Sequence, residues 1–179
     1  MKFYDIIVKD YSLNAKQISM MIADSEYKFN YFSTNKFNVT RPVKVKVNYY
    51  FGEDQIEEDY VSAGNPQIVS ENFKKLVEEF DSKAAQFFET NNITCKTKKK
   101  YYVMHITKSI FCLDRSKSKI YGLPSGESIA IGIVDVSKIS VNDHIFRLGE
   151  DTAKHYVSED FYKEYKKRKL TGCVFCLRS

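Results

Sequence analysis

The five-residue pattern Val-Ser-Glu-Asx-Phe occurs twice in this chain, at residues 69–73 and again 88 positions later at residues 157–161. A serine just before residues with helical spacing is typical of a helix N-cap, because its hydroxyl accepts hydrogen bonds from unpaired amides of the first turn. The glutamate that follows lies in that first turn, where the helix dipole favours a carboxylate. We therefore predict two capped helices, one beginning at Ser70 and Glu71 and the other at Ser158 and Glu159.

Each predicted helix has an apolar face and leads into a short apolar run. Apolar residues recur at helical spacing after both caps, which predicts that one face of each helix is buried. These residues are Phe73, Leu76, Val77, Phe80 and Ala84 in the first copy and Phe161 and Tyr165 in the second. The runs that follow, Phe87-Phe88 and Val174–Leu177, predict a return strand after each helix. This repetition is architectural and supplies no catalytic group.

Strand patterns dominate the rest of the chain. Apolar and polar residues alternate most clearly at Val43–Phe51, which predicts a half-buried strand. Further strands are predicted at Phe3–Val8, Phe87–Cys95, Ile129–Val134 and Ile145–Leu148, with a weaker strand pattern at Lys28–Phe32. The run Tyr101–Leu113 is predicted to form one or two central strands. We also predict a short helix at Asn14–Ala23 and a loop at Gly122–Ser128.

Strands and helices do not alternate regularly, so we predict an α+β fold: a mostly antiparallel sheet with two or three packed helices. A length of 179 residues fits one domain over residues 1–179, or two lobes at 1–60 and 61–179 that share a core. The first residues are charged and no apolar run approaches the length of a membrane span, so we expect a cytoplasmic protein without a signal peptide. Four cysteines in that compartment are expected to be reduced.

Charge is distributed unevenly along the chain. Residues 1–90 carry a net charge of −3 and residues 91–179 carry +8. The acidic charge is concentrated in five residues, Glu53, Asp54, Glu57, Glu58 and Asp59. The basic charge is concentrated in Lys96–Lys100 and in the second helix, at Lys163–Lys169. Such segments either are solvated or bind a partner of opposite charge, and the sequence leaves both interpretations open.

No catalytic, metal-binding or cofactor-binding constellation is recognisable. Cys173 and Cys176 resemble a Cys-x-x-Cys site, but in a strand positions i and i+3 point to opposite faces, so structural cysteines are favoured. The histidines His105, His144 and His155 are dispersed and have no catalytic neighbours. Asp114 and Ser118 fit a polar turn in which the carboxylate accepts hydrogen bonds from backbone amides. We therefore predict no cofactor, no metal and no enzyme activity.

Several short segments, taken in order, resemble family eleven of the bacterial polymorphic-toxin immunity proteins. They are Ile68–Phe73, Tyr101–Ile106, Cys112–Ser118, His144–Leu148 (with Phe146 and Arg147), Val157–Glu159 and Leu170–Phe175. The resemblance covers about residues 60–179. It implies a protein that binds and silences a cognate toxin domain in the cytoplasm of the producing bacterium and has no catalytic residues of its own.

Two alternative functions remain open from the sequence: a nucleic-acid-binding module and an enzyme of an unfamiliar type. Lys96–Lys100 followed by Tyr101 and Tyr102 places cations beside aromatic rings, as in a groove that binds single-stranded nucleic acid. The acidic first half of the chain argues against that partner, because it would repel phosphates. If the partner is a toxin, we expect the Glu53–Asp59 segment to contact a basic patch on it, with Lys163–Lys169 as the competing surface for an acidic toxin.

Overall fold

The structure, a computed structural model, describes residues 1–8, 18–22, 33–39, 41–49, 58–61, 67–91, 99–124 and 126–179. Within these residues the strands form three sheets, two of them large. The six-stranded sheet has the order β2 (Ile18–Ile22), β3 (Val43–Tyr49), β6 (Ala85–Asn91), β7 (Tyr101–Ile106), β5 (Gln67–Ser70) and β4 (Tyr60–Val61). The five-stranded sheet has the order β13 (Cys173–Leu177), β1 (Phe3–Val8), β12 (Asp151–Ser158), β11 (Ile145–Leu148) and β8 (Ser109–Ile110).

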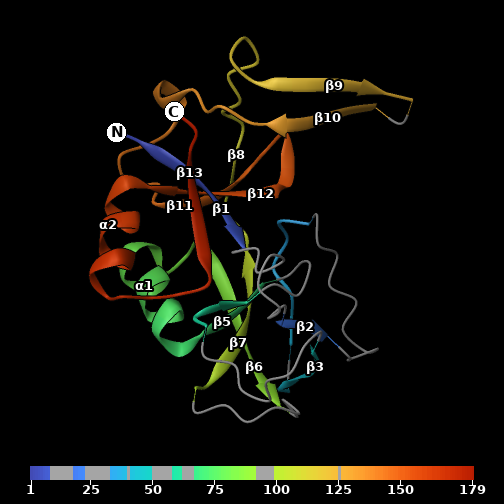
Figure 1. Ribbon diagram of the computed structural model, residues 1–179, viewed down its shortest axis with the longest axis vertical. Helices are drawn as coiled ribbons and strands as arrows, with labels where there is room; N and C mark the ends of the chain where they lie inside the picture. The colour runs from blue at the N-terminus through green and yellow to red at the C-terminus, as the bar shows by residue number, and fades with distance from the viewer. Residues whose placement is uncertain are drawn as a thin grey trace.

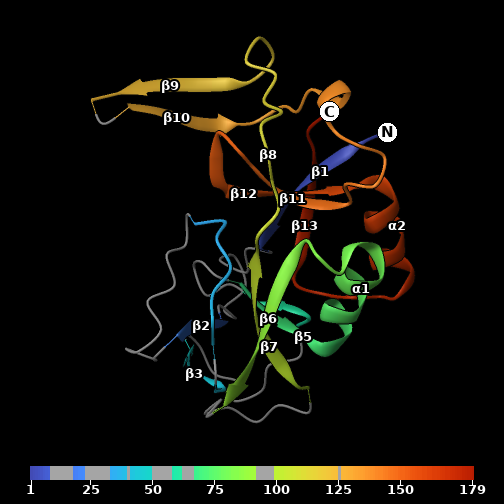
Figure 2. The ribbon, with the colours of Figure 1, turned by 180° about the vertical axis from the view of Figure 1, so that it is seen from behind.

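The third sheet is a two-stranded ribbon of β9 (Lys119–Leu123) and β10 (Gly126–Ile131), which extends away from the rest of the molecule (Figure 1). A short 3-10 helix, η1 (Val136–Lys138), follows the ribbon. The helices α1 (Glu71–Asp81) and α2 (Glu159–Lys167) lie side by side on one side of the molecule, and the chain ends N and C lie near each other (Figures 1 and 2). Neither described helix is long and apolar enough to cross a membrane.

The two predicted caps are confirmed. The Ser70 hydroxyl accepts a hydrogen bond from the amide of Phe73, and the Ser158 hydroxyl accepts one from Phe161, both at 3.2 Å. Glu71 and Glu159 lie in the first turns of the two helices. The buried helix residues are Phe73, Leu76 and Val77 in α1 and Phe161 and Tyr165 in α2. Ala84 is also buried, but it lies beyond the end of α1.

The five-residue repetition is part of a larger structural repeat. In the first unit β7 lies between β5 and β6, and in the second unit β1 lies between β12 and β13, with antiparallel pairing throughout. The strand registers also correspond: residues of the flanking strands that are 88 positions apart lie opposite central-strand residues that are 98 positions apart, as two pairs of contacts show. Val69 is opposite Tyr102 and Val157 opposite Tyr4; Phe87 is opposite Met104 and Phe175 opposite Ile6. The second unit therefore takes its central strand from the N-terminal end of the chain.

The two units meet through their helices. The corresponding residues Phe73 and Phe161 contact each other edge to face, with ring centroids 6.0 Å apart, and Phe80 packs on Phe161 at 5.5 Å. One apolar cluster contains these rings together with residues of both large sheets, including Val69, Met104, Ile145 and Val157. Burying a Phe side chain stabilises a fold by about 1.5–3 kcal/mol, so this shared cluster is a major link between the units.

Several predictions made from the sequence need correction. Ile18–Ile22 form a strand rather than part of a helix, because they pair with β3 along its length. The predicted loop at Gly122–Ser128 contains parts of two paired strands, with Gly122 opposite Glu127. Strand β12 was not predicted. The fold is α+β as expected, but its sheets are mixed, since β11 pairs with β8 and β3 with β6 in parallel. The predicted strand at residues 28–32 lies outside the described residues.

Candidate functional site

Asp59, predicted to contact a partner, is an internal residue with only 3% of its surface exposed. Its Oδ1 accepts hydrogen bonds from the Ser70 hydroxyl at 2.7 Å and the Lys99 ammonium at 2.9 Å. Its Oδ2 accepts one from the Thr171 amide at 3.0 Å. A buried carboxylate requires such donors, and here they link the cap of α1 to the connection between α2 and β13. Asp59 is therefore placed inside the fold and is not presented on the surface.

Of the other four acidic residues of that segment, the structure describes Glu58 alone. Glu58 is half-buried, and its backbone carbonyl accepts a hydrogen bond from the Tyr101 hydroxyl at 2.8 Å. Glu53, Asp54 and Glu57 lie outside the described residues, so a contact through them stays a prediction.

In the described part of the basic and aromatic segment Lys96–Tyr102, the residues do not form a surface for stacking bases. Tyr101 is 1% exposed and Tyr102 is 7% exposed, so neither ring is open to a nucleobase. Lys99 is paired with Asp59, and Lys100 forms an ion pair with Glu89 at 2.7 Å while lying over the Tyr102 ring. Lys96–Lys98 lie outside the described part of the chain. This geometry disfavours the nucleic-acid alternative.

The basic helix α2 is less basic than its sequence indicates. Lys163 pairs with Glu159 at 3.5 Å and Lys167 with Glu164 at 3.1 Å. Arg168 donates to Glu164 at 3.0 Å and to Glu79 of α1. Lys166 lies over the ring of Tyr162, 5.8 Å from its centroid. Much of the positive charge is thus compensated within the helix pair, which weakens α2 as a surface for an acidic partner.

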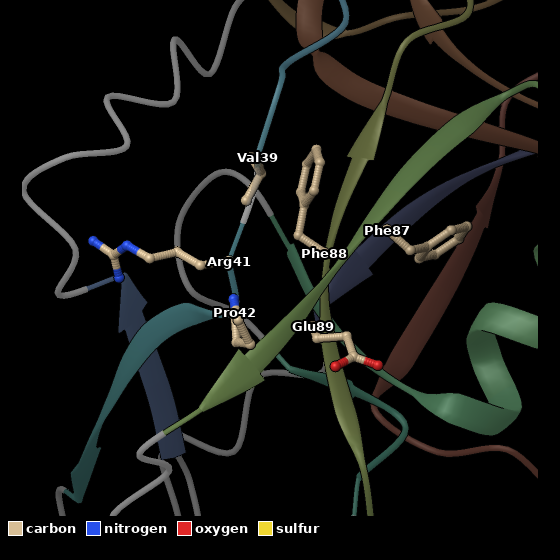
Figure 3. A pocket seen from close by; sticks show the side chains of 6 residues that line it. All are labelled: Val39, Arg41, Pro42, Phe87, Phe88 and Glu89. Atoms are coloured by element: carbon tan, nitrogen blue, oxygen red, sulfur yellow. The ribbon is translucent and has the colours of Figure 1, made fainter.

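A pocket of about 270 Å³ lies beside β6 and is lined by Val39, Arg41, Pro42, Phe87, Phe88 and Glu89 (Figure 3). The Phe88 ring points towards Val39, whereas Phe87 points to the other side of the strand, and Glu89 is paired with Lys100 (Figure 3). Small-molecule sites usually enclose about 300–1,000 Å³ and converge several polar groups on the ligand. The pocket falls below that range and has one acidic and one basic side chain, so we infer no substrate site from it.

Arg147, His105 and His155 form a buried basic cluster, each with at most 3% of its surface exposed. The guanidinium of Arg147 lies 3.3 Å from His105 Nδ1 and donates to the Thr152 carbonyl at 3.2 Å. Burial lowers the pKa of His105 to about 4 and, with the charge of Arg147 adding to it, the pKa of His155 to about 3. The neighbouring Phe146 is fully buried. These residues are inaccessible to a substrate.

The remaining predicted motifs are also structural. Asp114 Oδ1 accepts hydrogen bonds from the amides of Ser116 and Lys117, and the Ser118 hydroxyl closes the turn on the Asp114 carbonyl at 2.6 Å. Cys173 and Cys176 both lie in β13, and burial raises the pKa of the Cys173 thiol well above its usual value. Among the described residues no three His, Cys, Asp or Glu side chains are grouped to hold a metal ion.

The β9–β10 ribbon has an exposed apolar face, which was not predicted from the sequence. Residues opposite each other in an antiparallel pair share a face. Tyr121 is opposite Ser128, and Lys119 is opposite Ile131, so one face combines Lys119, Tyr121, Leu123 and Ile131. Tyr121 is 47%, Leu123 52% and Ile131 39% exposed. The spacing of Lys119, Tyr121 and Leu123 at every second position fits a strand, but the glycines at 122 and 126 favoured the prediction of a loop.

The amino-acid sequence of this chain is similar to that of a known protein family. The model of a family described as "Immunity protein family (Imm11)" matches residues 42–176. The chain belongs to this family. The matched region includes α1, α2 and the ribbon, and no curated protein matches the chain. Membership of the Imm11 family confirms the resemblance seen in the ordered segments, and it extends that resemblance from residue 60 back to residue 42.

Proposed function

We propose that this Imm11 protein binds the toxin domain encoded beside it and neutralises that domain in the cytoplasm of the producing bacterium. The family match over residues 42–176 carries the proposal. The environment of the predicted chemical groups supports it: the histidines of the buried basic cluster are inaccessible, and the Asp114 turn is occupied by its own hydrogen bonds. A protein of this kind acts through its surface and needs no cofactor.

The test begins with the neighbouring gene, which we expect to encode a large secreted protein with a variable C-terminal domain. Expression of that C-terminal domain alone should stop growth, and co-expression of this chain should restore it. The two proteins should also co-purify as a stable complex. A toxic domain that is neither bound nor counteracted by this chain would contradict the proposal.

The nucleic-acid alternative has its own readout. Fluorescence polarisation with labelled single strands should show no binding at micromolar protein, because Tyr101 and Tyr102 are buried and Lys100 is ion-paired. Micromolar binding that weakens steeply with salt would favour the alternative instead.

We also keep part of the acidic segment as a proposed contact with the toxin: Glu58 and the three residues outside the described part, Glu53, Asp54 and Glu57. A charge reversal, Glu57→Lys with Glu58→Lys, should slow association with a basic toxin surface, because clustered charge chiefly affects the association rate. An unchanged association rate at low salt would remove this segment from the contact surface.

A further inference from the structure

The β9–β10 ribbon is an addition to the repeated units. Each repeated unit consists of three paired strands and one helix, and among the described residues neither unit uses β9 or β10 in its large sheet. The ribbon projects beyond the body of the molecule, at the top of both views (Figures 1 and 2). Its inward side is held by Ile129, which is 8% exposed, and by Ile120, both of which pack in a cluster with Leu113 and Val134. This packing accounts for the apolar side chains on the inner side of the ribbon, but not for those on its outer side.

For the outward face, the described residues provide no comparable packing. Tyr121, Leu123 and Ile131 are each between 39% and 52% exposed, although they lie close together on one face of a two-stranded sheet. An isolated two-stranded ribbon is marginally stable, and apolar side chains that stay half exposed stabilise it less than buried ones would. Single exposed apolar residues are ordinary, but several together on a projecting element indicate a surface that a partner covers.

The charge on this face indicates what kind of partner fits. Lys119 is its single charged side chain, and the Lys119 ammonium lies 5.4 Å from the centre of the Tyr121 ring. Other charges on the ribbon and in the turn before it are compensated, because Arg115 pairs with Glu127 of β10 at 2.6 Å and Lys117 pairs with Asp114 at 3.0 Å. A second copy of this chain, with its own Lys119 and a net charge of +5, is a poor match for the face.

We propose that the toxin domain docks on this outward face, with Tyr121 inserted as the central anchor and Leu123 and Ile131 packed around it. The complementary toxin surface is apolar and carries a carboxylate that pairs with Lys119. Tyrosine suits this role, since it combines a large apolar ring with a hydroxyl and is enriched among residues that dominate binding energy. This inference rests on the proposed function and specifies where that function is exerted.

The experiment measures the dissociation constant and association rate of the full chain with the C-terminal domain encoded by the neighbouring gene. Tyr121→Ala and Leu123→Ala should each raise the Kd about tenfold or more. Lys119→Glu should slow association at low salt, with a smaller effect at high salt. Leu177→Ala is the matched control, because Leu177 is 48% exposed on β13, outside the ribbon, and it should leave the Kd unchanged. Thermal melting of each variant verifies that the fold is retained.

Hydrogen exchange supplies a measurement that needs no variant. Amides of residues 119–131 should become protected when the toxin domain binds. The inference would be overturned if Tyr121→Ala and Leu123→Ala both bound the toxin domain with the wild-type Kd. It would also be overturned if the toxin domain protected only amides outside residues 119–131, or if only the variant Glu57→Lys with Glu58→Lys weakened binding. Absence of binding by the wild-type chain would instead refute the proposed function, and with it this inference.

Discussion

At Gly172 the chain passes so close to β4 that no side chain fits. The Thr171 carbonyl accepts hydrogen bonds from the amides of Asp59 and Tyr60, both at 3.1 Å. Gly172 then adopts a φ of +97°, and a Cβ at this position would lie 2.1 Å from the Tyr60 carbonyl oxygen. Neither the left-handed backbone nor the backbone oxygen can adjust cheaply, so glycine is required here.

We expect Gly172→Ala to lower the free energy of unfolding by about 3 kcal/mol or more, because it combines backbone strain with a clash against main chain. Gly122→Ala is the control: nothing lies within 4 Å of a Cβ there, and the change should stay within about 0.5 kcal/mol. Urea denaturation of the two variants measures both values. Equal effects would show that the close approach to Tyr60 does not constrain the fold.

At the scale of secondary structure, each capping serine also hydrogen-bonds to the residue just before a neighbouring strand, Asp59 before β4 and His144 before β11. The Ser70 amide donates to the Asp59 carbonyl at 2.8 Å, and the corresponding Ser158 amide donates to the His144 carbonyl at 3.0 Å. The hydroxyls make matching contacts, with Asp59 Oδ1 at 2.7 Å and His144 Nδ1 at 2.9 Å. Each serine therefore satisfies a helix amide and a second buried or half-buried group at once.

Ser70→Ala and Ser158→Ala should each cost about 2 kcal/mol, more than the roughly 1 kcal/mol of an exposed cap, since the partner of the hydroxyl also loses a hydrogen bond. Ser82→Ala is a suitable control, because Ser82 is exposed at the other end of α1, where a hydroxyl is not needed as a cap. Thermal or chemical denaturation gives the comparison. A loss at Ser70 no larger than at Ser82 would remove the capping assignment.

Local signals could be read from the sequence, and long-range ones could not. The two caps and the buried helix residues Phe73, Leu76, Val77, Phe161 and Tyr165 depend on spacing within a few residues and are confirmed. The strand predicted at Val43–Phe51 is also confirmed over its described part, Val43–Tyr49. Ile18–Ile22 were misread because Ile18, Met21 and Ile22 also fit helical spacing, and only pairing with β3 determines the strand. Likewise, nothing local separates Asp59 from the four carboxylates before it; its burial depends on Thr171, over a hundred residues away.

At the scale of the whole molecule, the buried basic cluster lies where the two large sheets meet. His105 belongs to β7 of the six-stranded sheet, whereas Arg147 and His155 belong to β11 and β12 of the five-stranded sheet. The contact between Arg147 and His105 thus bridges the sheets. The His105 Nε2 lies 2.9 Å from the Asn35 carbonyl, so Nε2 carries the proton and Nδ1 is left as an acceptor for Arg147.

This arrangement predicts that the protein loses stability in mild acid. The pKa values of His105 and His155, about 4 and about 3, lie below the ordinary value of 6.5, so the unfolded chain takes up protons first as the pH falls. The free energy of unfolding should decrease by about 2 kcal/mol for each histidine between about pH 6.5 and pH 4.5, and both contributions are fully present above that range. Urea denaturation at several pH values measures the slope.

The variant His155→Asn isolates one of the two contributions. Asn removes the titrating ring, so the dependence of stability on pH over this range should be roughly halved, even if the variant is less stable at pH 7. The slope is therefore a better readout than stability itself, which any change in the core would lower. A variant with the full wild-type slope would show that His155 does not resist protonation in the folded state, and that the acid sensitivity comes from other groups.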